Sequence, residues 1–412
     1  MVSTPPPSTG NQVSSAPPSP ARPVIDMARI ASLATRAGSM IEQIRSRLLA
    51  PEARKTPPTF STAQLATLCG VDKAHVAYRI SKDDLPSGRL TPTGGKRIFE
   101  LAELQTWART YRADKMRPSG KKAITIAVGN FKGGVAKTTT SMVLAQGLSM
   151  RGHRVLAIDT DPQGSLTTLH GLLPEAEVSE DMTIAPLCDG SESDIRYAIR
   201  STYWDGIDLV AAAPFLFSAE FALPARQMQQ SDAEFWNVLN EGLESVRDLY
   251  DVIVIDTPPS LSYVTINALW AANGIVVPVP PSGLDFASSA QFWALLADLG
   301  ANLDGQSKGP HGKNFDFLHV LLSRVDSADP AMPAVRSWIQ ATYGEYTLPV
   351  EIPKTSVTSN KAAEFATIYD VQKYEGSAKT YKRAADAYDA FVDLVEQSVV
   401  GAWAEPASDD VP

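Results

Sequence analysis

One stretch of the chain limits its possible folds more than any other. A continuous apolar run, Ile124–Val128, leads into a glycine-rich segment over residues 129–136, and a helical pattern follows over residues 138–150. Glycine lets a backbone approach an anion closely, and the N–H groups at a helix N-terminus point toward that anion. A continuous β-branched run is typical of a strand that is covered on both faces of its sheet. This stretch therefore predicts a phosphate-binding loop in an α/β domain.

The side chains of this loop suit the phosphates of a nucleotide. Lys137 can reach the β- and γ-phosphates, and the Thr138 hydroxyl can ligate Mg²⁺. The generic phosphate-loop pattern fails here, because Phe131 and Ala136 stand where that pattern has glycines. The prediction therefore rests on the variant Lys-Gly-Gly-x-x-Lys-Thr, which begins at Lys132.

Acidic residues follow two other apolar runs. Asp159 and Asp161 come after the run at residues 154–158, and Asp256 comes after the run at residues 252–255. In open α/β sheets, ligands bind at the carboxyl ends of the strands. A single aspartate at such a place could merely cap a loop. Three motifs in this order on one sheet predict a site for phosphoryl transfer, which needs positioning and charge neutralisation.

Strand and helix patterns alternate over residues 121–402, which we expect to form one α/β domain with a mostly parallel sheet. Further strands are expected at residues 207–211, 275–279, 317–322 and 346–350. A helix is expected over residues 384–400, where Asp386, Asp389, Asp393 and Glu396 make it acidic. Such a helix favours packing over membrane binding, for which a basic face is typical.

A smaller unit is expected before this domain, over residues 57–117. It shows a capped helix that ends at Cys69, a turn, a second helix over residues 73–80, a Pro- and Gly-rich segment over residues 81–97 and a last helix over residues 100–111. This order is that of a winged helix-turn-helix. Residues 21–122 hold 19 Lys and Arg against 9 Asp and Glu, although the whole chain has a net charge of -9. This distribution favours contact with DNA, with an ordinary solvated surface as the alternative.

The candidate DNA-contacting residues of this unit lie on its second helix and on its wing. They are His75, Tyr78 and Arg79 on the helix, and Lys96 and Arg97 on the wing. A recognition helix places a few side chains at base edges while basic neighbours contact phosphates. Tyr78 could instead be part of the core, and the basic side chains could be merely solvated.

The remaining segments are a first helix and two tails. Residues 1–23 are rich in Pro, Ser, Thr and Gly and are expected to be disordered, and residues 403–412 are expected to be a flexible acidic tail. Residues 24–50 carry apolar residues at spacings of three and four, which predicts a helix with an apolar stripe. Such a stripe needs a partner, and a second copy of the same helix would supply it.

Composition excludes several classes of protein. No run of eighteen apolar residues is present, so we expect no membrane span. Cys69 and Cys188 lie far apart without further metal-ligand spacing, which excludes a disulfide framework and a zinc site and fits a reducing cytoplasm. The N-terminus lacks the pattern of a secretory signal.

The three motifs together resemble the ParA/MinD superfamily, whose deviant Walker A motif is similar to Lys132-Gly-Gly-Val-Ala-Lys137-Thr-Thr. The resemblance implies that ATP binds to Lys132, Gly133, Gly134, Val135, Ala136, Lys137, Thr138 and Thr139, with Pro353 beside the adenine. It implies catalytic roles for Lys132, which reaches the partner's nucleotide in a sandwich dimer, for Lys137, and for Asp161, which positions the attacking water. It further implies that Thr138, Asp161 and Asp256 act on Mg²⁺.

The winged unit makes the chain similar to the larger partition ATPases of this superfamily. That similarity implies a cytoplasmic, nucleoid-associated bacterial homodimer that binds operator DNA and works with a ParB-like centromere-binding protein. It also implies ATP-dependent binding to non-specific DNA, for which Arg336, Lys354 and Lys361 are the candidates and Arg324 follows a strand. The alternatives are an ATP-gated repressor without a transport role, and a positioner of another cellular cargo.

Overall fold

The computed structural model of the chain describes residues 26–48, 55–92, 94–229, 233–304, 313–354, 366–371 and 376–404. The chain divides into two compact units, residues 1–53 and 54–412. The predicted tail at residues 1–23 lies outside the described residues. The prediction of a tail from residue 403 was wrong at its start, since residues 403 and 404 belong to the last helix, where Trp403 is buried.

The first unit contains one described helix, α1 (Met27–Leu48). Its apolar side chains point into solvent: Met27, Ile30, Leu33 and Met40 are each about half exposed or more. Residues of this kind are usually covered, so the helix presents an apolar stripe that no other described residue of its own unit covers.

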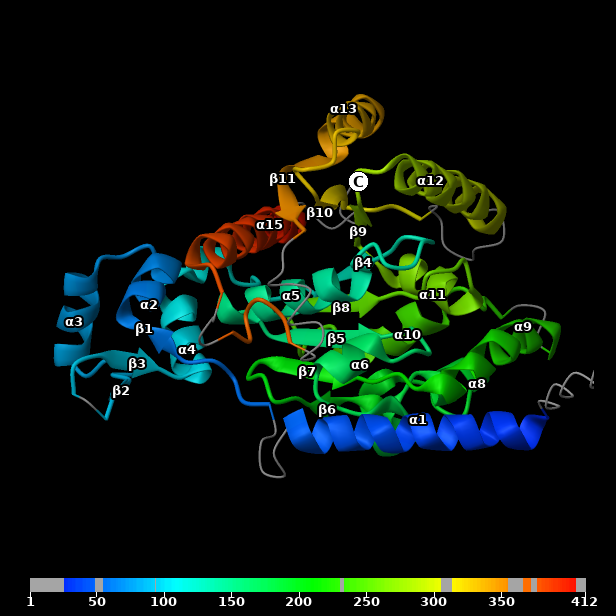
Figure 1. Cartoon of the computed structure of the whole chain (residues 1–412), viewed down its shortest axis with the longest axis horizontal. Helices are drawn as coiled ribbons and strands as arrows, with labels where there is room; N and C mark the ends of the chain where they lie inside the picture. The colour runs from blue at the N-terminus through cyan, green and yellow to red at the C-terminus, as the bar shows by residue number, and fades with distance from the viewer. Residues whose placement is uncertain are drawn as a thin grey trace, which may run out of the picture. The chain divides into compact units, whose positions relative to one another are not determined.

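The second unit contains an eight-stranded sheet in the order β11-β10-β9-β4-β8-β5-β7-β6 (Figure 1). Among the described strands, every pairing in this sheet is parallel except that of β6 with β7, so the predicted mostly parallel α/β fold is confirmed. The strands are β4 (Ile124–Val128), β5 (Val155–Asp159), β6 (Arg200–Ser201), β7 (Ile207–Val210), β8 (Val252–Asp256), β9 (Gly274–Val279), β10 (Phe317–Val325) and β11 (Thr347–Pro353).

Helices cover both faces of this sheet. They are α5 (Lys137–Met150), α6 (Ser165–Leu169), α7 (Pro174–Glu177), α8 (Ala185–Asp189), α9 (Ala219–Gln229), α10 (Val238–Leu243), α11 (Tyr263–Ala271), α12 (Gly283–Asp304), α13 (Met332–Tyr343) and α15 (Ala378–Ala404). Successive residues of a strand point to opposite faces. In β5, Val155 and Ala157 accordingly join the core beneath α5 and α15, whereas Leu156 and Ile158 join the core beneath α8, α10 and α11. This double burial explains the continuous apolar runs in the sequence.

A small domain, residues 55–115, precedes the sheet in the same unit. Its elements are β1 (Phe60–Ser61), α2 (Thr62–Cys69), α3 (Lys73–Ser81), β2 (Arg89–Leu90), β3 (Arg97–Phe99), α4 (Leu101–Tyr111) and the short helix η1 (Ala113–Lys115). Ser61 and Gln64 form a capping box at the start of α2, and Gly70 ends that helix in the left-handed conformation. The Asp72 side chain then caps α3. The sequence thereby specifies a helix, a tight turn and a second helix.

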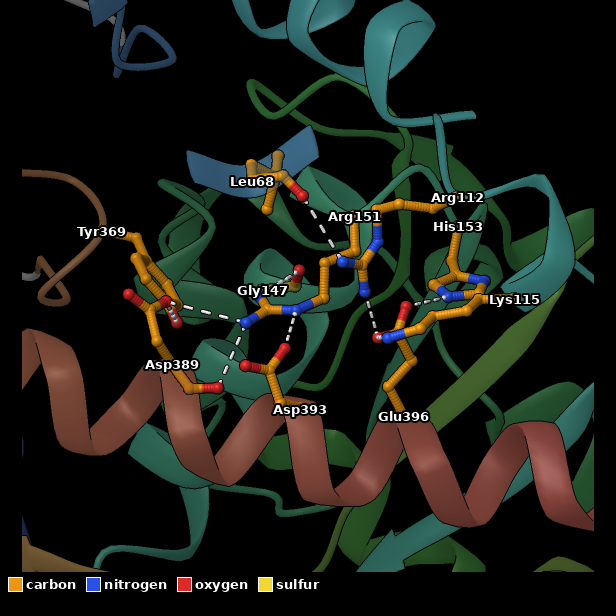
Figure 2. A network of polar contacts seen from close by, with 10 residues as sticks. All are labelled: Leu68, Arg112, Lys115, Gly147, Arg151, His153, Tyr369, Asp389, Asp393 and Glu396. Carbon is orange, nitrogen blue, oxygen red and sulfur yellow. Dashed lines mark hydrogen bonds and ion pairs between the residues drawn. The ribbon is translucent and has the colours of Figure 1, made fainter. Parts of the chain in front are cut away.

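The small domain is joined to the sheet domain by buried ion pairs (Figure 2). Glu396 of α15 is fully buried and pairs with Arg112, which follows α4, and with His153, at 2.9 Å between Oε1 and Nε2. Lys115 of η1 lies 3.9 Å from the same carboxylate. Beside this group, Arg151 at the end of α5 pairs with Asp393 at 2.8 Å. Acidic residues of α15 therefore bind cations from both domains.

Candidate nucleotide-binding site

The glycine-rich loop connects β4 to α5, where the sequence predicted it. Two of its residues have left-handed backbone conformations, Gly134 with φ 76° and Ala136 with φ 74°. Left-handed residues between right-handed ones turn successive N–H groups into an anion-binding concavity. The loop ends at Lys137, the first residue of α5, so the helix N-terminus faces the same point.

The left-handed conformation strains Ala136, because the Cβ atom of an L residue approaches its own backbone there, at a cost of about 1–2 kcal/mol. We expect Ala136→Gly to raise the free energy of unfolding by about 1 kcal/mol, part of the strain relief being offset by the extra freedom of glycine in the unfolded chain. Thermal unfolding measures this. The control is Ala294→Gly on an exposed turn of α12, which should lower stability by about 1 kcal/mol. Equal losses in both variants would contradict the argument.

Lys137 lies under the loop. Its side chain is largely buried, and its Nζ donates a hydrogen bond to the Lys132 carbonyl at 2.9 Å. Burial lowers the pKa of Lys137, while the carboxylates of Asp256 and Asp161 act in the opposite direction. Those charges favour the ammonium form, which can interact with phosphate oxygens in the concavity.

Two carboxylates lie side by side at the carboxyl ends of the central strands, because Asp159 of β5 and Asp256 of β8 are direct neighbours in the sheet. Asp159 accepts hydrogen bonds from the backbone N and the hydroxyl of Thr167, each at 2.8 Å. Burial and the nearby Asp256 carboxylate raise the pKa of Asp159 to about 8. Asp159 is therefore a structural member of the pair, whereas Asp161 lies on the loop that follows.

Asp256 suits a metal-bound water. Its Oδ1 accepts a hydrogen bond from the Ser141 hydroxyl at 2.8 Å, and burial raises its pKa to about 6. Its Oδ2 is buried without a hydrogen-bond partner among the described residues. No group of three or more His, Cys, Asp or Glu gathers as a metal-ligand set within the described part of the chain. The unpartnered Asp256 oxygen suits Mg²⁺, which keeps several waters and takes one or two protein carboxylates besides substrate phosphates.

The mouth of the loop opens into a cavity of about 360 Å³. Lys132 lies on its rim, where its Nζ pairs with Asp285 Oδ1 at 2.6 Å. Lys354, which follows Pro353 at the end of β11, lines the same cavity. Its Nζ pairs with the Asp326 carboxylate at 3.1 Å. Nothing in the sequence marks Asp285 as a partner of Lys132, because an aspartate in the first turn of a helix is common.

The predicted DNA-contacting residues of the small domain differ in whether their side chains are exposed or bonded to other residues of the domain. Tyr78 and Lys96 are exposed, so the alternative that Tyr78 is part of the core was wrong. His75 and Arg79 both bond to the Tyr111 hydroxyl, at 2.6 and 2.7 Å, and Arg79 also pairs with Asp84. The Arg97 guanidinium donates to the backbone carbonyls of Ser87 and Gly88, just before β2.

Of the predicted non-specific DNA contacts, Arg336 pairs with Glu351 at 2.6 Å and Lys354 with Asp326 as described above. Lys361 lies outside the described residues. Within the described residues, no helix is both long and apolar enough to pass through a membrane.

Comparisons with known proteins agree with this geometry. Residues 123–304 match the model of a family described as an AAA domain. The chain is 31% identical over 380 residues to "Putative replication protein A" of Rhizobium rhizogenes, covering 89% of this chain and 93% of that protein. It is 31% identical over 261 residues to the chromosome-partitioning ATPase Soj of Thermus thermophilus, covering 63% of this chain and 93% of Soj.

Two solved structures extend the comparison. One, described as a partition protein, is 18% identical with a TM-score of 0.62 and covers 92% of this chain and all of its own, which shows a shared fold. The other is cobyrinic acid a,c-diamide synthase from Mycobacterium smegmatis with an ATP analogue and magnesium, at 29% identity and a TM-score of 0.50, covering 66% of this chain and 94% of its own. With the loop, the paired carboxylates and these relatives in place, the chain belongs to the ParA/MinD family of P-loop ATPases.

Proposed function

We propose that this protein is an ATP-driven switch for DNA partition. The observation that carries the proposal is the arrangement at one sheet edge of the left-handed loop, buried Lys137 and the carboxylates after β5 and β8. Positioned cations, amides and acids of this kind are what phosphoryl transfer requires. The similarity to Soj, named as a chromosome-partitioning ATPase, supports partition as the use of that chemistry.

In this proposal residues 132–139 bind the ATP phosphates, and Pro353 lies beside the adenine. Thr138, Asp161 and Asp256 would hold Mg²⁺, which neutralises phosphate charge when it is bound. Lys137 stabilises the negative charge of the transferring phosphoryl group, and Asp161 orients the attacking water. Lys132 leaves its own chain and reaches the nucleotide of a second copy.

The second part of the proposal concerns assembly and DNA. The exposed apolar stripe of α1 supports pairing of two copies through that helix. The element order of the small domain, with exposed Tyr78 and Lys96, supports a winged helix-turn-helix that binds operator DNA and represses its own operon. The ATP-bound dimer binds nucleoid DNA in the bacterial cytoplasm without sequence preference, and a ParB-like protein stimulates hydrolysis and release.

The test is binding to a random-sequence DNA duplex, measured by fluorescence anisotropy with Mg²⁺ and either ADP or a slowly hydrolysed ATP analogue. We expect tight binding with the ATP analogue only, and a linear fall of log affinity with log salt concentration as counterions are released. Equal binding with ADP and with the ATP analogue would contradict the proposed switch.

A second candidate, an ATP-gated repressor without a transport role, is favoured by one observation. The small domain is fixed to the sheet domain by the buried Glu396 ion pairs, so a nucleotide-dependent change could reach it directly (Figure 2). This candidate needs ATP binding but no stimulated turnover, which separates it from the first.

A further inference from the structure

The carbonyl groups of the phosphate-binding loop need partners of their own. When the N–H groups of such a loop face an anion, its C=O groups must turn outward and find donors there. The Lys137 Nζ donates a hydrogen bond to the Lys132 carbonyl. The Ala136 carbonyl accepts one from the Thr140 backbone N, in the first turn of α5, at 2.9 Å. Of the three carbonyls between them, those of Gly134 and Val135, at the left-handed turn, accept hydrogen bonds from another strand.

That strand is β10. The Ser323 hydroxyl donates to the Val135 carbonyl at 3.0 Å, and the Arg324 Nη1 donates to the Gly134 carbonyl. In a regular strand, successive side chains point to opposite faces, so neighbours such as these could not reach one loop together. β10 is not regular here, because its pairing with β11 shifts register between Leu322 and Val325.

The backbone of Arg324 makes the double contact possible. Its φ is 53°, in the left-handed region that L side chains seldom adopt. Among the described residues, only Asp83, Ala136 and Arg324 combine a side chain with a positive φ. Two of these three thus lie at the phosphate loop, one in it and one bonded to it. Strained residues persist where the surrounding structure requires them, and they cluster at ligand sites.

We propose that Arg324 is a positioning residue for the phosphate-binding loop. Its guanidinium keeps the Gly134 carbonyl turned outward, which leaves the N–H groups of the left-handed turn directed at the phosphates. Ser323 does the same for Val135, whose side chain is buried. The role rests on the proposed binding of ATP to this loop. It also differs from the sequence-based interpretation of Arg324 as a DNA contact, because the guanidinium is already bonded to the loop.

Arg324→Gly gives a sharp test, because its two expected effects have opposite signs. Glycine is relaxed at a φ of 53°, so the midpoint of thermal unfolding should stay equal or rise. The loop loses a charge-assisted bond, so affinity for a fluorescent ATP analogue with Mg²⁺ should fall about tenfold or more. In turnover, KM should rise by a similar factor while kcat stays within about twofold, as expected when ground state and transition state lose the same binding.

Two further variants keep the test decisive. Arg324→Lys retains a cation that can donate to the same carbonyl and should recover part of the lost affinity, and Ser323→Ala should cause a smaller loss than Arg324→Gly. Unchanged affinity in Arg324→Gly, with wild-type protein binding the analogue, would overturn the positioning role alone. Wild-type protein that does not bind the analogue would instead overturn the proposed function, and the positioning role with it.

Discussion

Lys132→Ala is expected to abolish the ATP turnover that DNA and a ParB-like partner stimulate, while ATP still binds. In the proposed sandwich dimer, Lys132 neutralises charge on the partner's transferring phosphoryl group. A cation supplied in this way by a second chain typically contributes about 10³–10⁵ in kcat, so we expect a loss of at least about a hundredfold. The fold should tolerate the change, because the Lys132 side chain is one-third exposed and a surface ion pair contributes about 0–1 kcal/mol.

Asp285→Asn is the matched control for this variant. It weakens the same ion pair but leaves Lys132 in place, and its amide oxygen can still accept the hydrogen bond that the Ser282 hydroxyl donates to the Asp285 side chain at the start of α12. Stimulated turnover should therefore survive in Asp285→Asn and be lost in Lys132→Ala. Steady-state phosphate release measures both. Stimulated turnover that persists in Lys132→Ala would exclude the assigned role of this lysine.

Glu396→Ala is expected to lower the free energy of unfolding by about 3–5 kcal/mol, the range seen when one partner of a buried ion pair is removed. The Glu396 carboxylate is fully buried and serves Arg112, Lys115 and His153, which would be left without their shared anion (Figure 2). Urea denaturation measures this effect. Asp386→Ala on the same helix is the control, because the exposed Lys382–Asp386 pair should be worth about 0.5 kcal/mol or less. Equal effects of the two variants would contradict the account of the junction.

The same carboxylate predicts a pH dependence. Burial acts to raise the pKa of Glu396, but the hydrogen bond from His153 and the charges of His153 and Arg112 outweigh it, so the folded-state pKa is lowered. A lowered pKa means that the stabilisation is fully present above the unfolded value of about 4.3 and is lost as pH falls through the folded value. The stability difference between wild-type protein and Glu396→Gln should therefore be large at neutral pH and shrink in acid.

Local patterns in the sequence were sufficient to predict the sheet domain and its nucleotide loop. β4, β5 and β8 are buried on both faces, which makes each a continuous apolar run, and an acidic residue closes both β5 and β8. β6 was missed, because two residues at the sheet edge leave no periodic pattern. β11 extends to Pro353, beyond the predicted end at residue 350, since an edge strand tolerates proline.

The contacts that complete the site could not be predicted, because they join residues far apart in the chain. Nothing near Lys132 marks Asp285 as its partner, and nothing near Gly134 marks Arg324. The acidic stripe of α15 shows the same limit. Acidic residues at spacings of three and four usually form a solvated helix face, yet Asp393 and Glu396 bind Arg151 and Arg112. Only the fold brings these cations to that face.

ATP turnover of the purified protein tests the central claim most directly. It should be measured for the protein alone, with non-specific DNA, with a ParB-like protein encoded beside it, and with both together. We expect weak turnover that rises strongly only when DNA and partner are both present. ATP binding without turnover in any of the four mixtures would contradict a partition switch and favour the ATP-gated repressor.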